Sequence, residues 1–250
     1  MNYDISDLLK QWQFDPNEFT ARRIKSKDGT EKIQIRMDLG IMQLELNGRP
    51  DGQHPHDHPS LLDYYETINE DISLDEEQCE GLFQEAWQYY HRYLSLFYLE
   101  DYAGVVRDTD HVLGIFQTVQ KYANSEEVKW YFDQYYPHSI MMQTRAKAML
   151  ALGEDDYQVA LREIQAGIGQ LEQYLEEWEG EGLEEDLPEL SFLREWHEEV
   201  EQKRPLSRRE QLERDLNVAV ATENFEEAAR LRDKIQTMWP GPRRLFRPEH

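Results

Sequence analysis

Cysteine, long apolar runs and positive charge are all scarce in this sequence. Cys79 is the single cysteine among 250 residues, which excludes an internal disulfide and a cysteine-rich zinc site. No apolar run approaches the roughly 20 residues that a membrane-spanning helix needs. The first residues also lack the basic start and apolar core of a secretory signal. These absences predict a cytoplasmic protein that spans no membrane.

Positive charge is not only scarce but unevenly placed. The net charge is −24; residues 203–250 hold 11 Lys/Arg and 8 Asp/Glu, which leaves −27 on residues 1–202. Nucleic acids are bound chiefly through phosphates that Lys and Arg neutralise, so a body this acidic would repel them. Direct nucleic-acid binding is therefore not expected, and only the C-terminal part could offer a small basic surface.

Residues 1–62 have the pattern of a small β unit behind a short helical lead. Asp28-Gly29 is a strong hairpin signal between two runs, and a second turn at residues 38–40 precedes a third run. The result is an antiparallel three-stranded meander, whose apolar face needs a cover. The apolar residues that alternate along these runs are Ile33, Ile35, Met37, Leu39, Met42, Leu44 and Leu46.

Residues 73–178 are predicted to be helical, with a capping pair of Ser73 and Glu76 at the first long helix. Tyr102 and Tyr157 both follow an aspartate, and both pairs come just after a helix that ends near a leucine. This arrangement resembles the turn and second helix of a tetratricopeptide (TPR) repeat. The spacing is longer than the usual 34 residues or so. The resemblance implies a helical stack with a concave, peptide-binding surface.

Residues 179–206 are predicted to be a junction. Its first part is acidic and interrupted by glycines, and a short helix is expected over residues 191–203. This composition is typical of a linker that separates two parts of a chain. Beyond the proline-rich end of the last helix, residues 240–250 are expected to form a disordered tail.

Residues 207–239 carry two copies of a helix-start signature, Ser207 with Glu210 and Asn224 with Glu227. Each copy opens a segment with apolar residues at helical spacing, so the segment is predicted to be a hairpin of two short helices. The expected apolar stripes are Leu212, Leu216, Ala219 and Val220 in the first helix, and Phe225, Ala228, Leu231, Ile235 and Met238 in the second.

This segment resembles the UVR motif, the helical hairpin at the ends of the bacterial excinuclease subunits UvrB and UvrC. Related copies occur in Clp-family ATPases and in McsA-type activators of protein arginine kinases. The resemblance implies a docking module that pairs with another such hairpin or with a partner protein. The residues that it assigns to partner binding are Leu212, Leu216, Ala219, Phe225, Glu226, Ala228, Ala229, Leu231, Arg232, Asp233 and Ile235.

The remaining candidates for chemistry are weak. His54, His56 and His58 are possible zinc or nickel ligands, but the prolines among them favour a polar loop over a closed tetrahedral site. The aromatic residues of 87–98 and 130–136 could line a peptide groove, although helical spacing favours a core role. Acidic pairs such as Glu126-Glu127 are expected to be solvated, and Cys79 is expected to be an unreactive thiol.

Together these patterns predict a mainly α, α+β protein, in which an N-terminal β meander packs on a TPR-like helical body and a C-terminal hairpin follows. The predicted function is a non-enzymatic adaptor that needs no cofactor and docks onto a second UVR-type hairpin or onto itself. One alternative is an accessory factor of nucleotide excision repair. Another is a regulator of a Clp protease or stress kinase, although the zinc-binding cysteines of McsA are missing. The third is a metal-dependent enzyme that uses the His54–His58 loop.

Overall fold

The computed structural model describes residues 4–68, 72–177 and 187–238. The chain divides into two compact units, Met1–Glu201 and Gln202–His250, and each is described by itself. The acidic stretch of the predicted linker, 179–186, and the predicted tail, 240–250, lie outside the described residues.

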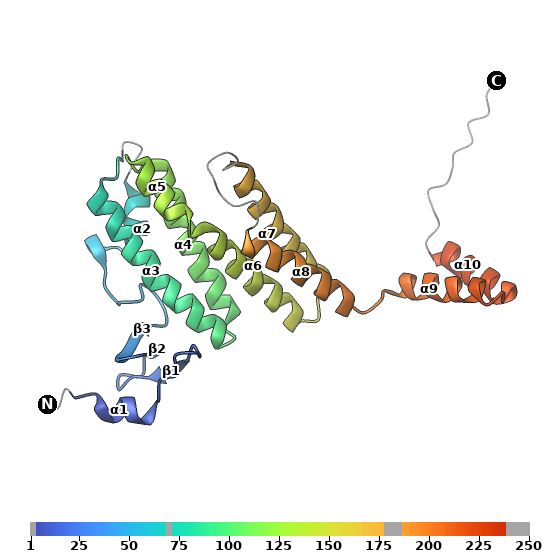
Figure 1. Ribbon diagram of the computed structural model, residues 1–250, viewed down its shortest axis with the longest axis horizontal. Helices are drawn as coiled ribbons and strands as arrows, with labels where there is room; N and C mark the ends of the chain where they lie inside the picture. Colours follow the sequence, from blue (N-terminus) through green and yellow to red (C-terminus); the bar gives the residue numbers. More distant parts are fainter. Residues whose placement is uncertain (1–3, 69–71, 178–186, 239–250) are drawn as a thin grey trace, which may run out of the picture. The chain divides into compact units, whose positions relative to one another are not determined.

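The first unit begins with the predicted meander. After helix α1 (Ser6–Gln11), strands β1 (Ala21–Lys25), β2 (Glu31–Met37) and β3 (Gly40–Glu45) form an antiparallel sheet in the order β1-β2-β3 (Figure 1). Gly29 takes a positive φ of 88° in the first turn, the conformation that glycine adopts without steric cost. The mainly α, α+β fold class is therefore confirmed.

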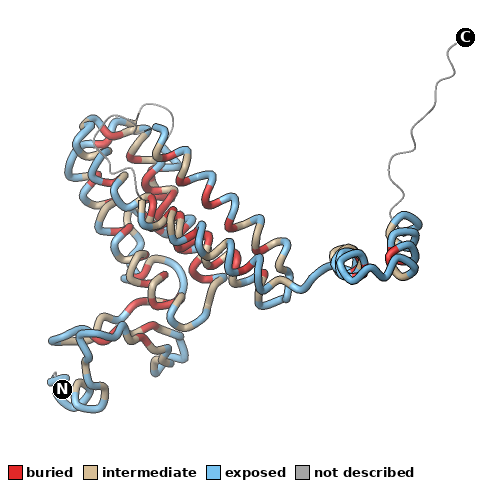
Figure 2. The backbone as a smooth tube through the Cα atoms, turned by 45° about the vertical axis from the view of Figure 1, so that its right-hand side comes forward, coloured by how far each residue is buried: buried red, intermediate tan, exposed pale blue. Residues whose placement is uncertain are grey.

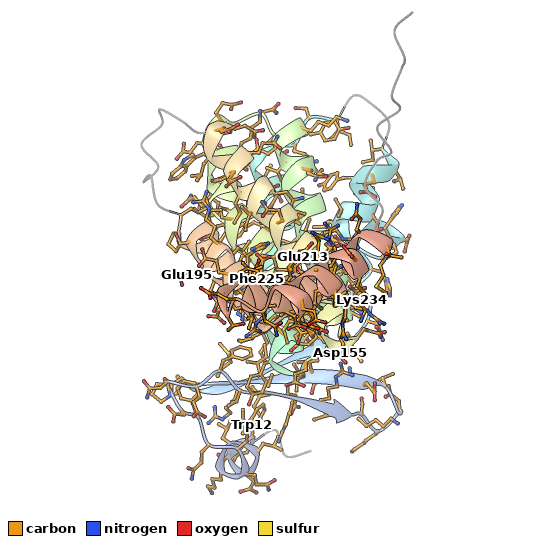
Figure 3. The ribbon with its side chains drawn as sticks, turned by 90° about the vertical axis from the view of Figure 1, so that its right-hand side faces the viewer. Trp12, Asp155, Glu195, Glu213, Phe225 and Lys234 are labelled. Atoms are coloured by element: carbon orange, nitrogen blue, oxygen red, sulfur yellow. The ribbon has the colours of Figure 1, made fainter. Side chains whose placement is uncertain are left out.

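One face of the sheet enters the core of the unit. Ile33, Ile35 and Leu44 are buried there with the helical residues, whereas Met37 and Leu39 are exposed. The buried alternation therefore ends earlier than predicted, because Met37 is the last residue of β2 and Leu39 lies in the turn that follows it. The guanidinium of Arg22 on β1 lies 4.2 Å from the ring of Trp12, which is labelled in Figure 3.

Helices make up the rest of the first unit, and those adjacent in the order α3, α4, α6 and α7 pack against each other (Figure 1). The core is continuous from the sheet to α8. The elements are η1 (Pro55–Asp57), α2 (Leu61–Thr67), α3 (Glu76–Tyr98), α4 (Tyr102–Tyr122), α5 (Glu126–Asp133), α6 (Tyr136–Gly153), α7 (Tyr157–Glu177) and α8 (Pro188–Lys203).

The predicted start of α3 is wrong by two residues. Asp75, not Ser73, is the N-cap, and it forms a capping box with Gln78. The Ser73 hydroxyl instead donates to Asn124 Oδ1 at 2.6 Å, next to an isolated bridge between Leu74 and Ala123. Ser73 thus joins the start of α3 to the end of α4, and Asp75, two residues later, is the cap.

Helix α8 is part of the body and does not behave as a linker helix. It begins at Pro188, three residues before the predicted start, and extends to Lys203. Leu190, Leu193 and Val200 are buried in the core that α3, α4 and α6 share. Their spacing of three and seven residues is that of a helix with one buried face, a signal that the acidic composition of the region obscured.

A glycine allows α6 and α7 to approach closely. A Cβ added to Gly167 on α7 would lie 2.1 Å from Thr144 Oγ1 on α6. Gly169 lies two residues further along α7, and no atom lies within 4 Å of a Cβ added to it. Only the first of these two glycines is therefore required by packing.

A buried ion pair joins the sheet to the helices. The Arg92 guanidinium on α3 donates to both carboxylate oxygens of Asp108 on α4, at 2.6 and 2.8 Å. The same guanidinium donates to the carbonyl oxygens of Glu45 and Gly48, at 3.0 and 2.6 Å. Arg92 and Asp108 are both buried. Four charge-assisted hydrogen bonds thus hold the end of β3 against α3 and α4.

A second buried carboxylate, Glu85 on α3, fixes the chain that leads from the sheet to α2. It accepts hydrogen bonds from the backbone N–H groups of Leu61 and Leu62, at 2.8 and 3.2 Å. His111 Nε2 lies 2.9 Å from Oε1 and Arg49 Nε lies 3.3 Å from Oε2. Neither buried carboxylate, Asp108 or Glu85, can be recognised in the sequence, because nothing distinguishes it from the other acidic residues in a chain that has 51 of them.

The second unit is the predicted hairpin, made of α9 (Arg208–Ala221) and α10 (Phe225–Met238). Its two helices pack against each other. Figure 2 shows this unit almost entirely in the exposed colour, in contrast to the red stripes of the body helices.

Candidate docking surface on the C-terminal hairpin

The start of α9 has the predicted capping box. Ser207 Oγ accepts from the Glu210 N–H at 3.2 Å, and Glu210 Oε2 accepts from the Ser207 N–H at 2.8 Å. Arg204 donates two further bonds to the same carboxylate, at 3.0 and 2.6 Å. These bonds, with Arg204 first and Ser207 next, lower the pKa of Glu210 to about 2. The first turn of the hairpin is thus fixed to the segment before it.

The second helix start is also confirmed. Asn224 Oδ1 accepts from the Glu227 N–H at 3.3 Å, and Glu223 takes a positive φ of 56° in the turn. The Asn224 N–H donates to the Ala219 carbonyl at 2.8 Å. These contacts reverse the chain within three residues, so α10 returns along α9.

The core of the hairpin is small. Four residues are buried between the helices, and Leu216 and Ile235 pack against them. Alanines at two of the four positions let the helices approach closely. Leu216 and Ile235 are half-buried. The buried residues are Leu212, Ala219, Ala228 and Leu231.

Burial changes the role of several predicted partner-binding residues. Leu212, Ala219, Ala228 and Leu231 hold α9 against α10, so they are not available to a partner while the hairpin stays closed. Of the predicted apolar binding residues, Phe225 and Ala229 are exposed. Phe225 is therefore the largest exposed apolar residue of the predicted set, and the four buried residues form the core beneath it.

Large apolar side chains of the hairpin remain exposed. Phe225 is 68% exposed, Val218 56% and Val220 52%, and Met238 is also exposed. Val220, Phe225 and Met238 belong to the predicted apolar stripes but lie outside the core of the hairpin. Helical residues are rotated by about 100° from one to the next, so Val218 and Val220 turn away on either side of the buried Ala219. So many exposed apolar groups on so small a unit are typical of an interaction site.

Charged side chains around this surface pair locally. Arg232 donates to its neighbour Asp233 at 2.8 Å, and Arg230 lies 3.3 Å from Glu227 one turn earlier. Glu226 is exposed. Both of these ion pairs lie within α10. Arg230, Arg232 and Asp233 are exposed and Glu227 is half-buried, and ion pairs near the surface contribute little to stability.

The geometry defines a class: a two-helix interaction hairpin with a minimal core and an exposed apolar surface. The family model described as "UvrB/uvrC motif" matches residues 207–237, which is almost the whole of α9 and α10. The C-terminal hairpin is therefore a UVR motif, and it implies interaction with a protein. Comparisons with curated proteins and with solved structures give no match. The TPR-like character of the helical body stays a prediction.

The histidine loop does not bring its candidate ligands together. His56 stacks on Tyr64 with ring centroids 4.1 Å apart, and His58 Nδ1 lies 2.7 Å from the His56 carbonyl oxygen. Residues 4–68, 72–177 and 187–238 contain no group of three or more His, Cys, Asp or Glu side chains placed to hold a metal. The weak metal candidates His54, His56 and His58 therefore find no support in this part of the chain.

Other sequence candidates have structural roles. Cys79 is buried, and burial, followed by the charges of Asp75 and Glu76, raises the pKa of its thiol, which agrees with an unreactive cysteine. Glu126 and Glu127 are exposed in the first turn of α5. Over the described ranges, no helix combines the length and the apolar character needed to cross a membrane.

Proposed function

We propose that this protein is a non-enzymatic cytoplasmic adaptor, which docks through its C-terminal UVR hairpin onto a matching hairpin. A second copy of the chain is the simplest partner. The observation that carries the proposal is the 68% exposure of Phe225 beside a four-residue core. A hairpin that buries so little apolar surface gains stability when a partner covers the rest.

Helical geometry indicates which side of the hairpin docks. If the buried residues define the inward direction, a rotation of about 100° per residue turns Val220 on α9 and Phe225 on α10 toward one side. Val218 is rotated by about 200° from Val220 and points to the other side. The proposed docking surface is therefore Val220 and Phe225, with Ala229 beside them and Arg232 and Glu213 at its edge.

Charge supports self-pairing through the hairpin rather than through the body. Residues 1–202 carry −27, so two bodies repel each other, whereas residues 203–250 carry +3. An isologous pair needs only one self-complementary surface. Within such a pair, Arg232 of one copy could meet Glu213 of the other and set the register.

Two substitutions on this surface and one matched control on the opposite side test it. Phe225→Glu and Val220→Glu place a charge in the proposed interface, where it would be buried without a partner, and we expect light scattering to show monomers. Val218→Glu adds the same charge at similar exposure on the opposite side, and we expect it to pair as the wild type does. Equal effects of Val218→Glu and Val220→Glu would contradict the proposed face.

A second candidate function is recruitment of excinuclease subunits in nucleotide excision repair. It is favoured by the match to the UvrB/uvrC motif at residues 207–237. It predicts that a UVR hairpin from such a subunit binds this protein and that Phe225→Glu abolishes binding. It also predicts DNA affinity only when that subunit is present, because the acidic body repels phosphates. DNA binding by the protein alone would overturn this candidate.

A further inference from the structure

The helical body contains an aromatic pocket that the hairpin does not use. It has a volume of about 380 Å³ and lies among α3, α4 and the start of α6. A cavity of about 150 Å³ holds one benzene, so this one has room for a bicyclic ring. Its lining includes the rings of Phe83, Trp87, Tyr90, Tyr93, Tyr135 and His138.

The walls of the pocket are aromatic faces. Trp87 and Tyr90 lie parallel, with centroids 5.2 Å apart and an angle of 10° between their planes. Phe83 and Tyr135 form another pair, at 5.6 Å and 55°. Trp87 is 47% exposed, so the pocket opens to solvent along the indole. Walls of this kind favour a planar ring, which can stack on one face and meet others edge-on.

His138 and Tyr93 place polar groups in the pocket, whose lining also includes the hydroxyl-bearing residues Tyr90, Tyr135 and Ser139. Tyr93 Oη, which is almost fully buried, lies 3.1 Å from His138 Nδ1. His138 itself is only half-buried, and no hydrogen bond to its second ring nitrogen, Nε2, is found among the described residues. A neutral imidazole has one donor and one acceptor nitrogen. With Nδ1 used by Tyr93, Nε2 can form one bond with a ligand.

The side chains of His138 and Tyr93 are both uncharged near neutral pH. Burial lowers the pKa of His138 and raises that of Tyr93. A charged ligand would lose its hydration here without meeting a counter-charge, which is unfavourable. A pure hydrocarbon would leave the imidazole nitrogen without a hydrogen bond. The pocket is therefore suited to a neutral ring with one polar atom.

We propose that this pocket binds a planar aromatic ring that carries a single N–H or O–H group, such as an indole or a phenol. The ring stacks between Trp87 and Tyr135, and its polar atom bonds His138 Nε2. The ring can belong to a free small molecule or to a tryptophan or tyrosine side chain. This inference is independent of the function proposed for the hairpin.

The test is calorimetric titration of the full-length protein with indole and with indene, the same bicycle without the N–H. We expect saturable binding of indole, roughly three- to tenfold tighter than of indene, because one hydrogen bond contributes about 0.5–1.5 kcal/mol. N-acetyl-tryptophanamide distinguishes the two sources: it binds if the pocket accepts a side chain with its backbone, and fails if only a free ring fits.

Variants locate the binding. Trp87→Ala should weaken indole binding at least tenfold, whereas Trp130→Ala removes an indole of the same 47% exposure outside the pocket lining and should change nothing. His138→Phe keeps a ring and should make indole and indene equivalent. Circular dichroism checks the fold of each variant. Absence of saturable indole binding to the wild type, or equal losses in Trp87→Ala and Trp130→Ala, would overturn the proposal.

Discussion

The body and the hairpin differ in how much apolar surface they bury between their helices. Both must hold amphipathic helices together, and the body does so with a continuous core from the sheet to α8, reinforced by buried carboxylates such as Asp108 and Glu85. The hairpin has four buried residues and leaves Phe225 and two valines exposed. The body packs its helices on one continuous core and pairs its buried carboxylates internally, whereas the hairpin has a small core and exposed apolar side chains that a partner protein could cover.

This difference assigns separate tasks to the two units. A body that is complete by itself can carry a pocket such as the one beside Trp87, because its walls do not depend on a partner. A hairpin that is incomplete gains from association, because burial of apolar surface is the main favourable term in association. Substitutions that act on one unit or the other can separate these two modes of stabilisation.

Asp108→Ala should have the largest effect, and it acts on the body. It leaves the buried guanidinium of Arg92 without its carboxylate, and removal of one partner of a buried ion pair costs about 3–5 kcal/mol. Urea unfolding of the body measures the loss. As a control, Glu172→Ala removes a surface partner of Arg194 and should cost no more than about 1 kcal/mol. Similar costs for both would contradict the role assigned to the buried pair.

Leu231→Ala should open the hairpin and leave the body intact. A buried leucine contributes about 2–5 kcal/mol, and the core of the hairpin has only three other buried residues to compensate. We expect a loss of helical circular dichroism, with no change in the thermal transition of the body. Val220→Ala, at an exposed position of α9, should keep the helical signal. A lowered transition of the body in Leu231→Ala would argue against two independent units.

Gly167→Ala should destabilise the body by a smaller amount. The added methyl would overlap Thr144, which lies 2.1 Å from its position, and overpacking costs about 1–3 kcal/mol. Gly169→Ala, on the same helix with free space around it, should instead stabilise by up to about 1 kcal/mol through helix propensity. Melting temperatures that move in the same direction would show that close packing of α6 on α7 is not the cause.

Glu210 gives the smallest expected effect, and it depends on pH. Its pKa is lowered from 4.5 to about 2 in the folded hairpin. Its contribution is therefore complete above about pH 4.5 and is lost as the pH falls toward 2. We expect the helical signal of the hairpin to fall over this range less steeply in Glu210→Gln than in the wild type. Side-chain NMR of Glu210 should give a titration midpoint near 2, and a midpoint near 4.5 would contradict the contacts with Arg204 and Ser207.

Local signals predicted the elements of the fold well. Asp28-Gly29 marked the first hairpin turn, and the Ser207–Glu210 and Asn224–Glu227 pairs marked both helix starts in the hairpin. These features depend on residues close in sequence, which a pattern can show. Ser73 was misplaced because a serine and an aspartate two residues apart compete for the same cap, and the bond from Ser73 to Asn124 decides between them across 51 residues.

The sequence predicted the UVR motif but not which of its side chains lie inside the hairpin. The pattern around Phe225 identified the motif, which the family model confirms, yet Leu212 and Leu231, assigned to partner binding, are buried between the two helices. Periodicity reports that residues share a face, and it does not say whether that face meets the neighbouring helix or a partner. A related reason applies to the pocket beside Trp87: the aromatic residues of 87–98 and 130–136 could line a groove, but periodicity favours a core role because it cannot show that side chains from three helices enclose a pocket.

The most direct test of the central claim is the mass in solution, by light scattering, of the full chain and of a chain that ends at Lys203. Self-pairing through the hairpin predicts a dimer for the full chain and a monomer for the shortened one, because the hairpin supplies the pairing surface and the acidic bodies repel each other. Monomers in both cases would contradict self-pairing. Dimers in both cases would contradict the role of the hairpin and would show that the interface lies in the body.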